Sequence, residues 1–210
     1  MNTKDRIISA AIKNFLNFGY EKTSLASIAE EVGIKKPSIY YHFKNKKELF
    51  NISLKNILES LEYNILKSTE NCTSSKEMFE SLFSTLLEFH IQLSVMIDKK
   101  HIKPVNIFAT LFSTLDAEDY KNSINNYYNL LNNTIIHILS IGQKRNEIRI
   151  DIKKDSICEQ IMAWFEGLLI LSSLYSSFNF NIAKQEFLDN LWILIGKTKK
   201  AKTISLGTKW

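Results

Sequence analysis

TSLASIAEEVGIKKPSIYYHFKNKKEL, residues 23–49, is the stretch that decides the fold of the N-terminal part of this chain. Ala29 is small where two helices must approach closely, and Gly33, four residues later, can take the positive φ that a sharp turn requires. Val32 and Ile34 flank the turn and can bury their side chains in the angle between the helices. The spacing predicts a helix-turn-helix, although many helical hairpins would satisfy the spacing alone.

The residues around the turn also mark where its two helices begin and end. Ser24 is a suitable N-cap for a short helix over residues 25–32, which Gly33 ends. Pro37 fits the first turn of a third helix, where its missing N–H costs nothing.

A longer helix is expected on each side of this unit. Asn45 can cap one that runs to about Ser68, with Glu48 in the position of a capping box. Thr3 can cap the first helix of the chain, and Gly19 can end it in a left-handed turn. Its apolar stripe, with steps of three and four, consists of Ile7, Ile8, Ala11, Ile12, Phe15 and Leu16.

The third helix can present one side to DNA. Ile39 packs inward, which leaves the neighbouring side chains outside. A recognition helix directs its N-terminal residues to the major groove, where donors reach phosphates and base edges. The outward candidates are Lys35, Lys36, Pro37, Ser38, Tyr40, Tyr41 and His42. The run at 40–42 could instead pack a helix on its neighbour, but five nearby lysines favour contact with DNA.

These residues resemble the signature of the TetR family of repressors. The resemblance covers about 45 N-terminal residues and is highly specific, because turn positions and groove-facing positions agree. The matching positions are Thr23-Ser24, Ile28-Ala29, Gly33-Ile34, Ser38, Tyr40-x-His42-Phe43 and Lys46-x-x-Leu49.

The resemblance implies an all-α homodimer with a three-helix DNA-binding head and a larger helical body that binds a ligand and dimerises. By matching position it implies DNA contacts from Ser24, Lys36, Pro37, Ser38, Tyr40, Tyr41, His42 and Lys46. Lys35 stands where many members have Ser, so the usual cap of the recognition helix is missing, which costs ~1 kcal/mol. Pro37 replaces a Gly that is common in the family.

Beyond the head, the chain reads as helix nearly throughout. Further helical patterns lie at about 76–97, 102–114, 119–143, 154–178 and 183–199. The segment 147–152 alternates Ile with charged residues, and we interpret it as a connection lying on the body rather than as a strand. The expected division is a helix-turn-helix domain at 1–45, a ligand-binding and dimerisation domain at 46–200 and a tail at 201–210.

The charge distribution supports a polyanionic partner for the head. Residues 1–50 hold nine Lys and Arg and five Asp and Glu, a net charge of +4. Residues 51–196 hold thirteen and seventeen, a net charge of −4. A basic head on an acidic body suggests contact with a polyanion, with a solvated charged surface as the simpler alternative.

Location and chemistry are constrained by what the sequence contains. The N-terminus is charged, and the most apolar stretch, 161–171, is interrupted by Glu166 and too short to span a bilayer, so we expect a cytoplasmic protein. Cys72 and Cys158 are far apart and suggest two ordinary thiols. The four His are scattered and no nucleophile or nucleotide-binding motif occurs, so we expect neither an enzyme, nor a metal site, nor a cofactor.

The C-terminal helices are candidates for an interface between two copies. The segment 154–178 is apolar nearly all round and must be covered on most faces. A monomeric core would be the simplest explanation, but the resemblance implies a four-helix interface with a second copy. The candidate dimer residues are Trp164, Gly167, Leu168, Leu171, Phe187, Leu191, Trp192 and Ile195.

A ligand pocket is expected between the long helices of the body. Glu166 lies in an apolar helix and needs a partner, which could be a cationic ligand, a Lys or Arg, or solvent. The candidate walls are Tyr63, Phe83, Phe89, His90, Phe108, Phe112, Tyr127, Tyr128, Met162 and Phe165. Aromatic residues at helical spacing belong to a core more often than to a ligand site.

The function expected from these features is that of a ligand-responsive repressor. It would bind double-stranded palindromic DNA as a dimer and be released by a small, mostly apolar molecule. One alternative is a regulator of the same fold that is controlled by a protein partner without a small-molecule inducer. A helical enzyme with an incidental helix-turn-helix is a third hypothesis, which the missing catalytic motifs disfavour.

Overall fold

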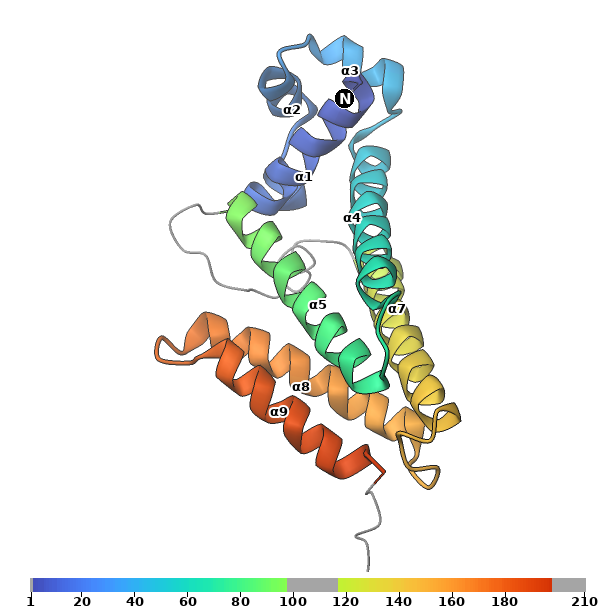
Figure 1. Cartoon of the computed structure of the whole chain (residues 1–210). Coiled ribbons are helices and arrows are strands. Elements are labelled where there is room, and N and C mark those ends of the chain that lie inside the picture. Colours follow the sequence, from blue (N-terminus) through green and yellow to red (C-terminus); the bar gives the residue numbers. More distant parts are fainter. Residues whose placement is uncertain (1, 98–116, 198–210) are drawn as a thin grey trace, which may run out of the picture.

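A computed structural model of the chain describes residues 2–97 and 117–197, and Figure 1 shows that these residues form an all-α protein. The helices of the described ranges are α1 (Thr3–Lys22), α2 (Leu25–Val32), α3 (Lys36–His42), α4 (Lys46–Thr69), α5 (Ser75–Ile97), α7 (Ala117–Lys144), α8 (Lys154–Leu174) and α9 (Phe180–Ile195). We call α1–α3 the head and α4–α9 the body. The expected helix at 102–114 and the tail at 201–210 lie outside the described residues.

The first helix begins one residue earlier than expected. Asn2, not Thr3, is its N-cap: the Asn2 side chain accepts a hydrogen bond from Asp5 N at 2.9 Å, and the Asp5 carboxylate accepts one from Asn2 N at 3.2 Å. This reciprocal pair is a capping box, which a cap at Thr3 would not form. Gly19 has the expected positive φ, 75°, but it kinks α1 instead of ending it, and one more turn follows to Lys22.

The helix-turn-helix forms as the sequence predicts. Ser24 caps α2 by accepting a hydrogen bond from Ser27 N at 3.0 Å. Gly33 ends α2 in the left-handed conformation with φ 73° and ψ 35°. Ile39 is fully buried under α3, where it joins Ile28 in the core of the head.

The long helix α4 joins the head to the body, as Figure 1 shows. Asn45 caps it by accepting from Glu48 N at 2.8 Å, as predicted. The Glu48 carboxylate accepts from the backbone N–H of Lys44 rather than from that of Asn45. At its other end the carbonyl of Ser68 accepts from the Ser81 hydroxyl of α5 at 2.7 Å.

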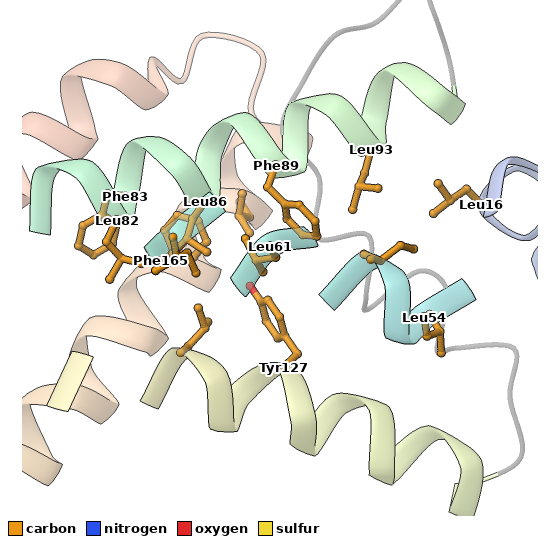
Figure 2. Close-up of a cluster of buried hydrophobic side chains, with 14 of the residues drawn as sticks. Leu16, Leu54, Leu61, Leu82, Phe83, Leu86, Phe89, Leu93, Tyr127 and Phe165 are labelled. Atoms are coloured by element: carbon orange, nitrogen blue, oxygen red, sulfur yellow. The ribbon is translucent and has the colours of Figure 1, made fainter. Parts of the chain in front are cut away.

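The core of the body lies where α4, α5, α7 and α8 meet. Figure 2 shows side chains from all four helices directed into the space between them, among them Leu61, Phe83, Tyr127 and Phe165. Each of these four side chains is at most 2% exposed. One continuous apolar core therefore runs from the head, through α4, into the body.

The far end of the body is fastened by polar contacts. Glu147, in the connection between α7 and α8, accepts from Ser75 N at 2.7 Å and from Ser75 Oγ at 2.5 Å, at the start of α5. Its carbonyl accepts from Lys197 N at 2.7 Å, and Ile148 forms an isolated bridge with Gly196 at the end of α9. The segment 147–152 is thus a connection on the body, as expected.

The last two helices are shorter than the apolar pattern suggested. The chain leaves the helical conformation at Tyr175, so α8 ends at Leu174 instead of 178. Asn179 caps α9, which begins at Phe180 rather than 183 and ends at Ile195 instead of 199. By length and composition α8 could cross a membrane, but core helices pass the same test, and α8 packs against α7 and α9.

Candidate nucleic-acid interface

The outer side of α3 is open to solvent along its length. Tyr41 is 87% exposed and Tyr40 is 51% exposed, whereas Ile39, on the opposite side of the helix, is fully buried. The remaining predicted contacts at the start of the helix, Lys35, Lys36, Pro37 and Ser38, are exposed as well. Because one residue anchors the helix inward, the others are held on a single outward surface, which we call the α3 face.

Two details of the α3 face follow from its local sequence. Lys35 occupies the N-cap position and makes no side-chain cap hydrogen bond. Pro37 has no N–H, and Ser38 N donates to the Lys35 carbonyl at 2.8 Å, so the start of α3 offers few backbone donors and its side chains must make most of any contact with DNA. His42 is half-buried and lies edge-on to Tyr41, with ring centroids 5.1 Å apart.

The head is held together by links between α1 and α2. Arg6 Nη2 donates to the carbonyl of Val32 at 2.6 Å, next to the turn. Glu31 accepts from Asn14 Nδ2 at 2.5 Å and from Lys13 Nζ at 2.6 Å. These contacts fix α2, and therefore the turn and the α3 face that follow it, relative to α1.

Ser24 and Lys46, the remaining predicted DNA contacts, lie at the starts of α2 and α4 rather than on α3. Ser24 is exposed at the start of α2, and its hydroxyl takes part in the cap. Lys46 is half-buried, and its Nζ donates to the carbonyl of Tyr20 at 2.9 Å while lying 4.2 Å from the centre of the Tyr20 ring. No local pattern indicates this contact, since the two residues are 26 positions apart.

Several predicted ligand residues are brought together in the core of the body, where they contact one another. His90 lies 5.4 Å from Phe89 and 5.9 Å from Phe165 between ring centroids, and Phe83 lies 5.6 Å from Phe165. The His90 Nε2 is 3.3 Å from the Tyr127 hydroxyl, and both side chains are fully buried. Phe108 and Phe112 lie outside the described residues.

Glu166 belongs to this buried cluster. Burial raises the pKa of the Tyr127 phenol well above its usual range, and the negative charge of Glu166, which shares a hydrogen bond with that phenol, raises the pKa further. Glu166 is half-buried, and Met162, one turn earlier on α8, is half-buried too. The Tyr127 hydroxyl is therefore a partner for Glu166 besides the three that sequence reasoning considered.

A groove of about 1190 Å³ lies elsewhere, between α4 and α7. Its lining includes the predicted residue Tyr63, which is 62% exposed, and Leu66, which is 64% exposed. The buried side chains of Ile65 and Ile138 form part of its apolar lining, and Asn133 adds an amide. We call this space the α4–α7 groove.

The predicted dimer residues divide into three groups. Leu168, Leu191 and Ile195 are at most 5% exposed and are buried within the chain. Phe187 stacks on Trp164 with ring centroids 3.5 Å apart, and both are half-buried, as is Trp192. Gly167 and Leu171 face outward: a Cβ on Gly167 would meet no atom within 4 Å, and Leu171 is 45% exposed.

Sequence reasoning did not single out the most exposed apolar side chains of α8 and α9. They are Ile170, Leu174, Ile182, Ile193 and Leu194, with Tyr175 just beyond α8. On α8, Gly167, Leu171 and Leu174 follow one another at steps of three and four and therefore share a face. A helical-wheel separation of the inward and outward sides of α8 could have found them. We call these exposed side chains, with Gly167 and Leu171, the α8–α9 face.

The described residues contain no group of three or more His, Cys, Asp or Glu side chains that could hold a metal ion. Their candidate site is instead a surface of donors and aromatic rings. The lysine, hydroxyl and phenol donors of the α3 face can bind the phosphates and the acceptor atoms of base edges in a DNA groove.

Comparison with known proteins agrees with this surface. Residues 7–51 match the family model described as "Bacterial regulatory proteins, tetR family". Over 193 residues, 91% of this chain and 96% of the relative, the chain is 28% identical to the Staphylococcus aureus protein named Biofilm operon icaADBC HTH-type negative transcriptional regulator IcaR. The Staphylococcus epidermidis protein of the same name is 26% identical over the same shares of the two chains.

Solved structures show the same fold. A TetR transcriptional regulator from Chloroflexus aurantiacus superposes with a TM-score of 0.73 at 17% identity, covering 93% of this chain and 97% of that one. One from Legionella pneumophila gives a TM-score of 0.71 at 23% identity, covering 90% and 97%. Residues 7–51 therefore match the TetR family of bacterial regulatory proteins, and the chain as a whole resembles DNA-binding transcriptional regulators with this fold.

Proposed function

We propose that this chain is a cytoplasmic, ligand-responsive repressor that binds a palindromic operator as a homodimer. Residues 1–45 would bind DNA, and residues 46–200 would bind the ligand and the second copy. The observation that carries the proposal is the α3 face, on which lysines and two exposed tyrosines stand around one buried anchor, Ile39. The relatives are named as negative regulators, which supports repression rather than activation.

The α8–α9 face supports the homodimer. Leu174 and Ile193 are each 81% exposed, although both are large apolar residues. Clusters of exposed apolar side chains mark interaction sites, and burying the side chains of the α8–α9 face against a second copy would remove them from water. Figure 1 shows α8 and α9 at the end of the molecule opposite the head, so a dimer formed there leaves both α3 faces available.

The α4–α7 groove supports a response to a small molecule. Its volume is sufficient for such a ligand, and its lining of Ile65, Ile138 and Met78 suits a mostly apolar one. A ligand held against α4 would act on the helix that carries the head. A changed tilt of α4 in both copies would alter the separation of the two α3 faces, which must match half-sites about 34–36 Å apart or a multiple of that distance.

A competing proposal is control by a protein partner without a small ligand. It is favoured by the packing of Phe83, Phe89, His90 and Phe165, the expected pocket walls, against one another in the core. A thermal-shift screen with uncharged and cationic amphiphiles separates the two. Melting temperatures that rise with ligand concentration, and fail to rise in the groove-filling variant Asn133→Trp, support the small-molecule proposal. Melting temperatures that no ligand changes support control by a protein partner.

DNA recognition itself is tested with the promoter region of the chain's own gene. A gel-shift titration at moderate salt should give a Kd on the order of 10⁻⁸ to 10⁻¹¹ M for that DNA and binding at least about 10³ times weaker for random duplex. Affinity for the specific site should fall steeply as salt rises. Equal binding of the two duplexes would reject the proposal.

A further inference from the structure

We propose that Lys46 is a positioning residue, which fixes the angle between the head and α4, and not a phosphate contact. This inference rests on the proposed binding of a dimer to two half-sites. The first residue of α4 stands beside the DNA-binding helix, where a lysine is expected to reach a phosphate. The contacts of its ammonium group point elsewhere.

The Lys46 ammonium is occupied within the chain. Its Nζ lies 2.9 Å from the carbonyl oxygen of Tyr20 and 3.4 Å from that of Glu21, and it donates to both. It also lies 4.2 Å from the centre of the Tyr20 ring, within the range of a cation–π interaction. An ammonium has three donors, and these three partners account for them. The side chain is half-buried rather than extended into solvent.

The end of α1 is built to receive a cation. Gly19, with φ 75°, kinks the helix, and the carbonyls of the short turn after it lie at the negative end of the helix dipole. The Thr23 hydroxyl holds the same turn by donating to the carbonyl of Gly19 at 2.8 Å. The Tyr20 ring in turn meets Phe50 of α4 edge-on at 5.0 Å between centroids.

The contact of Lys46 with the end of α1 lies between the head and the body, and this position gives it a function. The contacts of Arg6 and Glu31 fix α2 to α1, and α3 packs on α2 through Ile39. Lys46 belongs to α4, which runs into the body. The lysine therefore connects the unit that reads a half-site to the helix that sets where that unit stands in the dimer.

Salt dependence distinguishes the two roles. The slope of log K against log salt is negative, with about 0.9 from each phosphate contact. Removing one contact from each half-site would therefore make the slope of the dimer less steep by about 1.8. In Lys46→Met, which keeps the alkyl stem, we expect an unchanged slope with roughly tenfold weaker binding to the full operator. Binding to DNA with one half-site should stay within about twofold, because each α3 face is intact. Lys46→Arg can donate to the same carbonyls and should restore the full affinity.

The matched control is Lys44→Met, which removes the same charge from an exposed residue two positions away. Among operators whose half-sites are moved apart or together by single base pairs, Lys46→Met should prefer a different or broader spacing, whereas Lys44→Met should keep the wild-type optimum. A slope that becomes less steep by about 1.8 in Lys46→Met, with equally weakened binding to half and full sites, overturns the proposal.

A measurement without DNA separates this inference from the proposed function. Amide hydrogen exchange over residues 19–23 should become faster in Lys46→Met and stay unchanged in Lys44→Met. Unchanged exchange in Lys46→Met would show that the contact of Lys46 does not hold α1 and would overturn the inference. If the wild-type protein shows no preference for any operator, the proposed function fails, and the exchange result still decides whether Lys46 holds the head.

Discussion

Tyr41 is the most exposed aromatic side chain of the α3 face, and it lies two residues from the fully buried Ile39. A side chain that is 87% exposed contributes little to packing, so its removal should scarcely affect stability. Ile39 fills the space between α3 and the rest of the head. The two residues therefore separate binding from folding within one short helix.

Tyr41→Ala should change the free energy of unfolding by less than about 0.5 kcal/mol while weakening operator binding about tenfold. Ile39→Ala should instead destabilise the protein by about 2–5 kcal/mol, because it leaves a cavity under the helix. Denaturant unfolding followed by circular dichroism, with gel-shift titration of the same samples, measures both effects. Full operator affinity in Tyr41→Ala would show that the α3 face does not contact DNA through this residue.

Cys158 gives a pH-dependent prediction. Burial first, and the negative charges of Asp155 and Glu159 second, raise the pKa of its thiol from 9.0 to about 11. The unfolded chain then releases a proton that the folded chain retains, so the contribution of this thiol to stability is complete below pH 9 and is lost as the pH rises towards 11.

At pH 8 a thiol reagent should modify the half-buried Cys72 in the native protein and reach Cys158 only after unfolding. Titration with a chromogenic disulfide should count one reactive thiol before denaturant and two after it. The Cys72→Ser variant should show none in the native state. Rapid native labelling of that variant would contradict the burial of Cys158.

At the scale of the elements, caps and turns were predictable because they depend on local sequence. Ser24, Gly33 and Asn45 each act within four residues of the position they control. Asn2 was missed because Asn and Thr are both good caps, and only the partner at Asp5 decides between them.

Contacts between distant elements could not be predicted in the same way. The role of Lys46 depends on where the end of α1 comes to lie, which no local pattern specifies. For the same reason the apolar pattern of α8 predicted a helix but did not separate its buried residues, such as Leu168, from its exposed ones, such as Leu174. The spacing of the expected pocket walls predicted that they lie between the helices, but only the three-dimensional packing shows that Phe83, Phe89, His90 and Phe165 contact one another.

The turn between α2 and α3 carries a prediction about backbone conformation. Gly33→Ala should destabilise the head by about 1–2 kcal/mol, because φ 73° is unfavourable for a residue with a Cβ. No atom lies within 4 Å of that Cβ, so the cost comes from the backbone alone. Gly33→Asn should lose less, since Asn tolerates the left-handed region. Thermal unfolding of the three proteins gives the order, and equal melting temperatures would contradict it.

At the scale of the whole molecule, the charged and apolar surfaces lie at opposite ends. Figure 1 places the head and α3 at one end, with α8 and α9 at the other. A copy joined through the α8–α9 face would therefore give a dimer whose two heads lie away from the interface. This arrangement predicts that dimerisation and DNA contact can be broken separately.

Leu174→Glu should convert dimers to monomers at micromolar concentration, because it places a charge in an apolar contact. Sedimentation velocity measures the change, and operator binding should fall with it, since the two half-sites are no longer bound together. Leu66→Glu is the control: Leu66 is 64% exposed but lies on α4, so this variant should remain a dimer. A dimeric Leu174→Glu protein would place the interface elsewhere.

The fastening of Glu147 to Ser75 and of Ser68 to Ser81 has a consequence for movement. Both pairs lie at the end of the body that is far from the head, so they hold that end of α4 in place. The end of α4 next to the head can then move when the helix tilts. With 24 residues, α4 is about 36 Å long, and a tilt of about 5° would carry its end next to the head by about 3 Å, close to the rise of one base pair. A rotation of α4 that leaves the packing at its fixed end unchanged would then shift each α3 face by about one base pair along the duplex.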